Sequence, residues 1–131
     1  MLLPSIALQR CDQAITYYKE TLGAQVKTIN YFRDAPPDCG LDKDTPPNYV
    51  MYSQVQIHGA TICMTDGSEP IPGESFWFTL MFDTPEEVTD VFNKLADGGQ
   101  VIEPPTPQFW ASSNAYITDR FGIFWNILTN N

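Results

Sequence analysis

The chain has 131 residues, of which 43% are hydrophobic and 13% aromatic, a composition typical of an ordered globular domain. With 7 basic and 16 acidic side chains the net charge is -9, which excludes the basic footprint that nucleic-acid binding needs. This charge keeps a protein soluble and also favours, weakly, a cationic small molecule as ligand. No apolar run approaches the roughly 20 residues that cross a bilayer, and the three cysteines suit reduced thiols. We therefore expect a cytoplasmic protein that binds neither nucleic acid nor membrane.

The first half of the chain predicts one helix among short strands. Residues 5–9 predict a strand, and residues 11–22 predict a helix with Asp12 as its cap and Gly23 as its end. Residues 25–33 predict the next strand. The apolar side chains of the helix recur at the spacing of one buried stripe: Ala14, Ile15, Tyr18 and Leu22.

Two proline-rich connections interrupt this half. Residues 33–48 hold four prolines and four aspartates, a composition that predicts a mobile loop or a lid. Residues 49–57 predict a strand, which a tight turn at His58-Gly59 joins to the strand at 60–65. Residues 66–75 form the second connection.

The second half predicts the same plan. Residues 76–83 predict a strand, and residues 84–96 a helix that Thr84 caps and Pro85 begins. A short strand begins at 101, the prolines at 104, 105 and 107 predict a loop, and 109–128 supply two last strands. The turn between these two strands contains Asp119, which we expect to stabilise the turn rather than act in catalysis.

The two halves repeat each other. Gly-x-Gln-Val follows each helix, at 23–26 and at 98–101, and Ile15 precedes Val88 by 73 positions, as Leu22 precedes Leu95. Such a repeat is typical of a duplicated module whose open sheet pairs with its twin. We predict one domain over residues 1–131, with module 1 at about 1–66 and module 2 at about 76–131.

Four stretches of the chain are informative together: AITYYKETLGA at 14–24, GATICMTD at 59–66, FW at 109–110 and TDRFGIFWNI at 118–127. They resemble the vicinal oxygen chelate superfamily, which contains glyoxalase I, bleomycin-resistance proteins, fosfomycin-resistance enzymes and extradiol dioxygenases, and within it the PhnB-like branch. The resemblance implies an α+β fold of two tandem βαβββ modules forming a curled mixed sheet around a cleft, helices outside, in a homodimer. The branch is often labelled demethylubiquinone methyltransferase, but no Gly-rich cofactor turn follows the first strand here.

The metal-ligand positions that the resemblance implies carry poor ligands. In the superfamily's metalloenzymes, His, Glu or Gln from the first and last strands of each module hold a divalent ion. Asn126 stands where such relatives carry Glu, and we take Gln54 as its pseudo-symmetric partner. Neutral amides compensate poorly for the water that a cation loses, so we expect no catalytic metal and no cofactor. The other positions offer residues 3–5, Trp77 and Thr79, while His58 lies in a predicted turn.

Strand parity selects the residues that would line the cleft. Trp125 falls on the helix-facing side of the last strand, and Asn126 on the cleft side. The aromatic residues could hold a small planar ligand or simply fill a core, and Gln54 and Asn126 could bind each other or the backbone. The candidate ligand-binding residues are Tyr52, Gln54, Trp77, Thr79, Phe124 and Asn126, with Phe109, Trp110 and Tyr116 at the mouth.

The leading hypothesis is a PhnB-like protein that binds a small organic molecule in an aromatic cleft without a catalytic metal, and cationic molecules are among the candidate ligands. Such binding could sequester a toxic compound, as bleomycin-resistance relatives do. Whether any reaction is catalysed stays open. One alternative is a metal-dependent lyase, isomerase or dioxygenase whose ligands lie in another register, and another is a non-catalytic dimeric scaffold.

Overall fold

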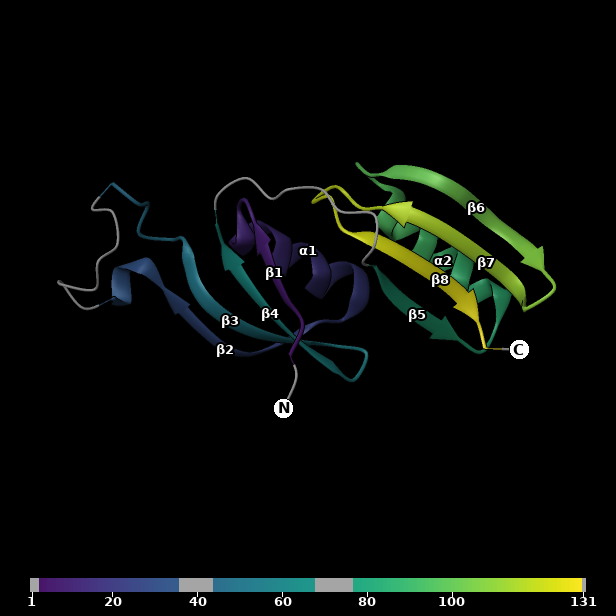
Figure 1. Cartoon of the computed structure of the whole chain (residues 1–131), viewed down its shortest axis with the longest axis horizontal. Helices are drawn as coiled ribbons and strands as arrows, with labels where there is room; N and C mark the ends of the chain where they lie inside the picture. The colour runs from purple at the N-terminus through teal and green to yellow at the C-terminus, as the bar shows by residue number, and fades with distance from the viewer. Residues whose placement is uncertain (1–2, 36–43, 68–76, 131) are drawn as a thin grey trace. The chain divides into compact units, whose positions relative to one another are not determined.

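The structure, a computed structural model, describes residues 3–35, 44–67 and 77–130. The chain divides into two compact units, Met1–Pro70 and Ile71–Asn131, each with one helix lying along a four-stranded sheet (Figure 1). No helix within the described ranges is long and apolar enough to cross a membrane. Phe76, residues 68–75 and residues 36–43 of the predicted lid lie outside the described residues.

The first unit is a mixed sheet with one helix on one face. Its elements are β1 (Ser5–Leu8), α1 (Cys11–Leu22), β2 (Gln25–Tyr31), a 3-10 helix η1 (Phe32–Asp34), β3 (Val50–Ile57) and β4 (Ala60–Asp66). The strand order is β1-β4-β3-β2, with β1 parallel to β4 and the other pairs antiparallel. His58 and Gly59 have φ angles of 47° and 86°, so the predicted tight turn between β3 and β4 is confirmed.

The start of α1 corrects one prediction. Arg10 is the N-cap residue and has a left-handed backbone conformation, but its side chain forms no capping hydrogen bond. The backbone N–H of Cys11 instead donates to Asp66 Oδ1 at 2.8 Å, and Asp66 Oδ2 accepts from Val50 N at 2.7 Å. Asp12, the predicted cap, contacts Asn48 Nδ2. The cap therefore comes from the end of β4, a long-range contact that local sequence patterns do not encode.

The second unit repeats this topology. Its elements are β5 (Phe78–Phe82), α2 (Pro85–Ala96), β6 (Gln100–Gln108), β7 (Ala111–Thr118) and β8 (Phe124–Thr129). The strand order is β5-β8-β7-β6, again with the first and last strands parallel. The predicted cap of α2 is confirmed, since Thr84 Oγ1 accepts from Glu87 N at 3.2 Å. Two βαβββ modules and the α+β class are thus present as predicted.

The proline-rich stretch after α2 is a strand rather than the predicted loop. β6 runs through Pro104, Pro105 and Pro107 and pairs with β7 as far as Gln108. β6 is the edge of its sheet, so backbone positions that face outward need no donor, and proline is tolerated there. Register shifts in the β6–β7 ladder accompany the prolines.

The turn before β8 is held by a buried carboxylate. Asp119 accepts from the backbone N–H of Phe121 at 2.8 Å and of Ile123 at 3.1 Å. Its other oxygen accepts from Trp125 Nε1 at 2.8 Å. Trp125 is 2% exposed and packs in the core under α2, as parity predicted. The predicted structural role of Asp119 follows directly from these contacts.

Candidate functional site

Residues of β8 alternate between two environments. Trp125 and Ile127 are buried on the face that α2 covers, and Phe124 and Asn126 lie on the opposite face. We call that opposite face, formed by β5, β8 and β7, the open face of the second sheet. Its side chains are those of Trp77, Thr79, Asn114, Tyr116, Phe124 and Asn126.

Three aromatic rings lie in a row on the open face. The ring centroids of Trp77 and Phe124 are 6.1 Å apart, and those of Phe124 and Tyr116 are 5.9 Å apart. Both separations fall within the range of favourable aromatic pairs. Trp77 is 48% exposed, which is a large exposure for a tryptophan side chain. The row thus offers apolar, planar surface to a partner.

A pair of carboxamides lies beside the aromatic row. Asn126 Nδ2 donates to Asn114 Oδ1 at 2.9 Å and to the backbone oxygen of Ala115 at 3.1 Å. Trp110 Nε1 donates to the same Asn114 oxygen at 3.3 Å. Two donors therefore fix which end of the Asn114 amide is oxygen. Asn126 therefore binds neighbouring groups of its own sheet.

Asn114 keeps one unsatisfied atom. The residue is 0% exposed, and its Nδ2 has no hydrogen-bond partner among the described residues. A buried donor without an acceptor costs about 1–3 kcal/mol. Asn114 was not among the predicted site residues, although the parity of β7 that selects Tyr116 also selects the residue two positions before it.

The first sheet carries a smaller polar cluster on the equivalent strands. Tyr52 and Gln54 lie on the face of β3 that points away from α1. The fully buried Ser53 and Val55 lie on the other face of β3, which α1 covers. Gln54 Nε2 donates to the Tyr52 hydroxyl at 2.6 Å. The Cys63 thiol on β4 lies 3.8 Å from the same hydroxyl. The tyrosine oxygen is thus the shared partner of two side chains.

The strand registers show which positions of the two units correspond. Leu8 and Phe82 each end the first strand three residues before the helix, and their partners are Asp66 and Thr129. Counting back three residues along the last strands makes Cys63 equivalent to Asn126. The predicted pairing of Gln54 with Asn126 is therefore wrong.

Gln54 lies on β3, and its counterpart is on β7. It pairs with Cys63 as Tyr116 pairs with Asn126, so Gln54 corresponds to Tyr116. By the same count Tyr52 corresponds to Asn114. A separation of 72 positions was close to the helix repeat, but the connections after the helices differ in length, and the offset falls to 63 at the last strands.

The structure distributes the predicted site residues over both units. Tyr52 and Gln54 lie together on the first sheet, whereas six others lie on or beside the open face of the second. Phe109 and Trp110 form the two-residue turn between β6 and β7, with ring centroids 4.7 Å apart. Phe109 is 97% exposed, so its ring covers little of the sheet. The six residues on or beside the open face of the second sheet are Trp77, Thr79, Trp110, Tyr116, Phe124 and Asn126.

The residues at the superfamily's metal positions do not fit a divalent ion. In each unit the first and last strands bring one pair together by register: Ser5 with Cys63, and Thr79 with Asn126. None of the four is a carboxylate or an imidazole, the donors that catalytic divalent ions take most often. In the described ranges, no three His, Cys, Asp or Glu side chains gather as a metal site would require.

The chain belongs to the Glyoxalase/Bleomycin resistance protein/Dioxygenase superfamily, whose family model matches residues 4–127. It is 30% identical over 126 residues to protein YjdN of Escherichia coli (strain K12), covering 89% of this chain and 86% of YjdN. The crystal structure of protein PA1353 from Pseudomonas aeruginosa superposes with a TM-score of 0.83 at 25% identity, covering 99% of this chain and 97% of that one.

A PhnB protein is also among the structural neighbours. The Bacillus cereus protein, which carries a 3-demethylubiquinone-9 3-methyltransferase label, has a TM-score of 0.79 at 15% identity and covers 98% of both chains. At this identity the likeness establishes the fold alone. The resemblance to the superfamily and to PhnB-like proteins, first indicated by four short stretches, is confirmed by these findings.

Proposed function

We propose that this protein binds a small planar organic molecule on the open face of the second sheet, and does so without a catalytic metal. The observation that carries the proposal is the aromatic row beside the carboxamide pair. Rings of Trp77, Phe124 and Tyr116 supply apolar area, and Asn126, which the buried Asn114 orients, supplies a polar anchor. Small-molecule sites typically combine mostly apolar walls with few convergent polar groups.

The Asn126 carboxamide supports a ligand that presents a hydrogen-bond donor. Asn126 Oδ1 accepts from none of the described residues, so it can receive a ligand donor. Asn114 is 0% exposed, so it orients the Asn126 amide and does not contact the ligand itself. A planar molecule with a donor group at its edge therefore matches this site.

Ring faces also attract cations, and the net charge of -9 adds to this preference. The proposal accordingly includes planar cations among the ligands. The superfamily resemblance adds a homodimer, which light scattering on the purified protein tests independently. The three cysteines, which suit reduced thiols, add a cytoplasmic location to the proposal.

The absence of a metal requirement rests on the donor set. Ser5, Cys63, Thr79 and Asn126 would bind Zn²⁺, Mn²⁺ or Ni²⁺ far more weakly than the His and Glu sets of metalloenzymes. Metal analysis of protein purified without chelator should therefore show substoichiometric amounts. Near-stoichiometric metal that disappears in both Asn126→Ala and Cys63→Ala would instead establish the metal-dependent enzyme as the function.

A thermal-shift screen with matched neutral and cationic aromatic compounds tests ligand binding. Compounds that bind should raise the melting temperature of the wild type. Trp77→Ala should lose most of this shift, because the Trp77 side chain is 48% exposed and is available to the ligand. Ile102→Ala removes an exposed side chain of β6 outside the aromatic row and should keep the shift. If no compound raises the melting temperature, and the dimer buries the aromatic row, the scaffold function replaces this proposal.

A further inference from the structure

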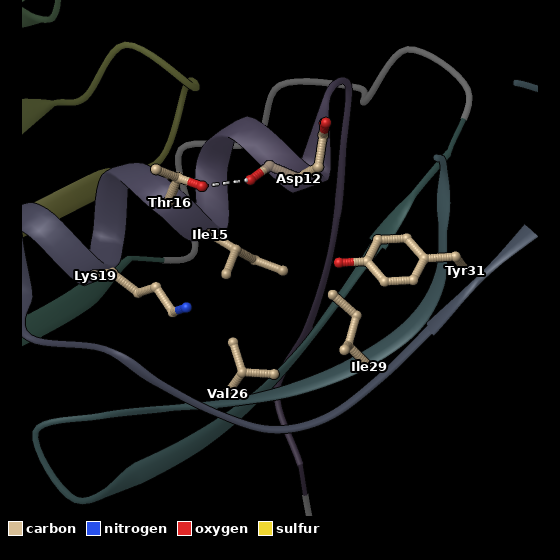
Figure 2. A pocket seen from close by; sticks show the side chains of 7 residues that line it. All are labelled: Asp12, Ile15, Thr16, Lys19, Val26, Ile29 and Tyr31. Atoms are coloured by element: carbon tan, nitrogen blue, oxygen red, sulfur yellow. Dashed lines mark hydrogen bonds between the residues drawn. The ribbon is translucent and has the colours of Figure 1, made fainter. Parts of the chain in front are cut away.

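A pocket of about 270 Å³ lies between α1 and β2, on the face of the first sheet opposite Tyr52 and Gln54 (Figure 2). The side chains of Ile15 from the helix and of Val26 and Ile29 from the strand form its apolar lining. Tyr31, Lys19, Thr16 and Asp12 complete it. Its volume is near the lower end for ligand pockets, which suits a short chain or a single ring.

The pocket exists because the two helices cover their sheets differently. α2 packs against β6, β7 and β8, so it covers its sheet as far as the edge strand. α1 packs mainly against β1, β3 and β4 and leaves the edge strand β2 less covered. A register shift between Val26 and Thr28 also bends β2.

Two hydrogen-bond donors converge on the pocket without partners. Figure 2 shows the ammonium of Lys19 and the hydroxyl of Tyr31 directed toward the space above Val26 and Ile29. In the described part of the chain, Lys19 Nζ forms no ion pair and Tyr31 donates no hydrogen bond. The Arg33 guanidinium carbon lies 4.1 Å from the centre of the Tyr31 ring and adds positive charge at this end. Both charges favour an anion.

Among the described residues, Asp12 is the one acidic side chain that lines the pocket. Its carboxylate accepts from Asn48 Nδ2 at 3.3 Å, and Figure 2 shows it at the start of α1, pointing away from the other lining side chains. Asp12 precedes Lys19 by seven residues, so their Cα atoms are about 10 Å apart along the helix. The carboxylate therefore leaves the positive end of the pocket available.

We propose that the pocket between α1 and β2 binds a small carboxylate with a short apolar tail, a site separate from the open face of the second sheet. The carboxylate pairs with Lys19 Nζ and accepts from the Tyr31 hydroxyl, and the tail lies on Ile15, Val26 and Ile29. The carboxylate and the tail of such a ligand each meet a part of the pocket with matching chemistry. A cation would be repelled by Lys19, and a polar molecule without an apolar part would leave the apolar lining without a partner.

Amide chemical-shift mapping on the ¹⁵N-labelled full chain tests this site with sodium hexanoate as the probe. Hexanoate should shift amides of residues 12–19 and 26–31 saturably, and hexylammonium, with the same tail, should bind at least about fivefold more weakly. Lys19→Gln should weaken hexanoate by about fivefold or more and remove the preference over hexylammonium. Thr16→Phe, which fills the pocket while keeping Lys19, should also weaken binding.

Lys27→Gln is the matched control, because Lys27 is an exposed lysine of β2 outside the pocket whose ammonium contacts Gln25. It removes the same charge and should leave hexanoate affinity unchanged. Equal losses in Lys19→Gln and Lys27→Gln would show non-specific attraction and overturn the site. Shifts confined to residues 110–126, or no saturable shift at all, would overturn it as well, and the aromatic screen above is unaffected by either result.

Discussion

Cys63 and Asn126 occupy the same position in the two units, and each hydrogen-bonds to the side chain at a second equivalent position. The Cys63 thiol is 3.8 Å from the Tyr52 hydroxyl, and the Asn126 amide is 2.9 Å from Asn114 Oδ1. Both contacts join the last strand of a module to the strand beside it. The duplicated module therefore keeps a polar contact at this position while using different residues, with neutral groups in both copies.

Asn126→Asp should destabilise the protein and the effect should grow with pH. The new carboxylate loses the donor that serves Asn114 and Ala115, which costs about 1–3 kcal/mol. Burial raises the pKa of the introduced carboxyl above the ordinary value of about 3.9. Its protonated form then supports folding at low pH, and that support is lost as pH rises through the raised pKa.

Urea unfolding of Asn126→Asp at pH 4 and pH 7 measures this. Asn30→Asp is the control, since Asn30 is exposed on β2. We expect the loss of unfolding free energy to be larger at pH 7 for the buried site and small at both pH values for the exposed one. A buried variant as stable as the wild type at pH 7 would show that the Asn126 amide contributes nothing there.

Local patterns in the sequence predicted much of the fold. Helical spacing located α1 and α2, and Thr84-Pro85 and His58-Gly59 carry the chemistry of a cap and a tight turn in themselves. Alternation along β8 correctly separated Trp125 from Asn126. These features depend on residues close together in the chain, which is why the sequence alone reveals them.

The errors all concern relationships between distant residues. Pro104 and Pro105 predicted a loop because their strand's place at the sheet edge was unknown. Gln54 was paired with Asn126 because the helix offset was carried into strands where connections of unequal length change it. Of the candidate site, parity found the aromatic row, but the hydrogen bonds that make Asn114 its central acceptor depend on the register of β7 and β8.

Asp66→Ala should destabilise the first unit far more than Asp12→Ala. Asp66 accepts from the backbone of Cys11 and Val50, so its removal leaves two donors without their acceptor and costs about 2–4 kcal/mol. Asp12 caps no backbone group and contributes at most about 0.5 kcal/mol through the helix dipole. Hydrogen exchange at the first turn of α1 should accelerate only in the Asp66 variant, and equal exchange in both variants would contradict the capping role.

Asp119→Ala should destabilise the second unit by about 3 kcal/mol, because it strips acceptors from three donors in a buried turn. Asp119→Asn keeps one acceptor for the backbone but places an amide against Trp125 Nε1, so its stability should lie between the alanine variant and the wild type. Urea unfolding followed by tryptophan emission measures the order. If the alanine and asparagine variants are equally stable, the Trp125 contact and the backbone contacts are not separable.

The Cys11 thiol should couple stability to pH in the alkaline range. Burial, with the nearby charges of Asp66 and Asp12, raises its pKa from 9.0 to about 12. The folded state therefore holds the proton that the unfolded state releases, so the thiol's contribution is complete below pH 9 and is lost between pH 9 and about 12.

Comparison with Cys11→Ala isolates this effect from tyrosine and lysine titration, which both proteins share. The difference in unfolding free energy between wild type and variant should shrink from pH 7 to pH 10. Iodoacetamide at pH 8 should leave Cys11 of the native protein unmodified and label it after unfolding in urea, because the folded side chain is 0% exposed and only the thiolate reacts. A free-energy difference that stays constant from pH 7 to pH 10 would contradict the raised pKa, and rapid labelling of native Cys11 at pH 8 would contradict its burial as well.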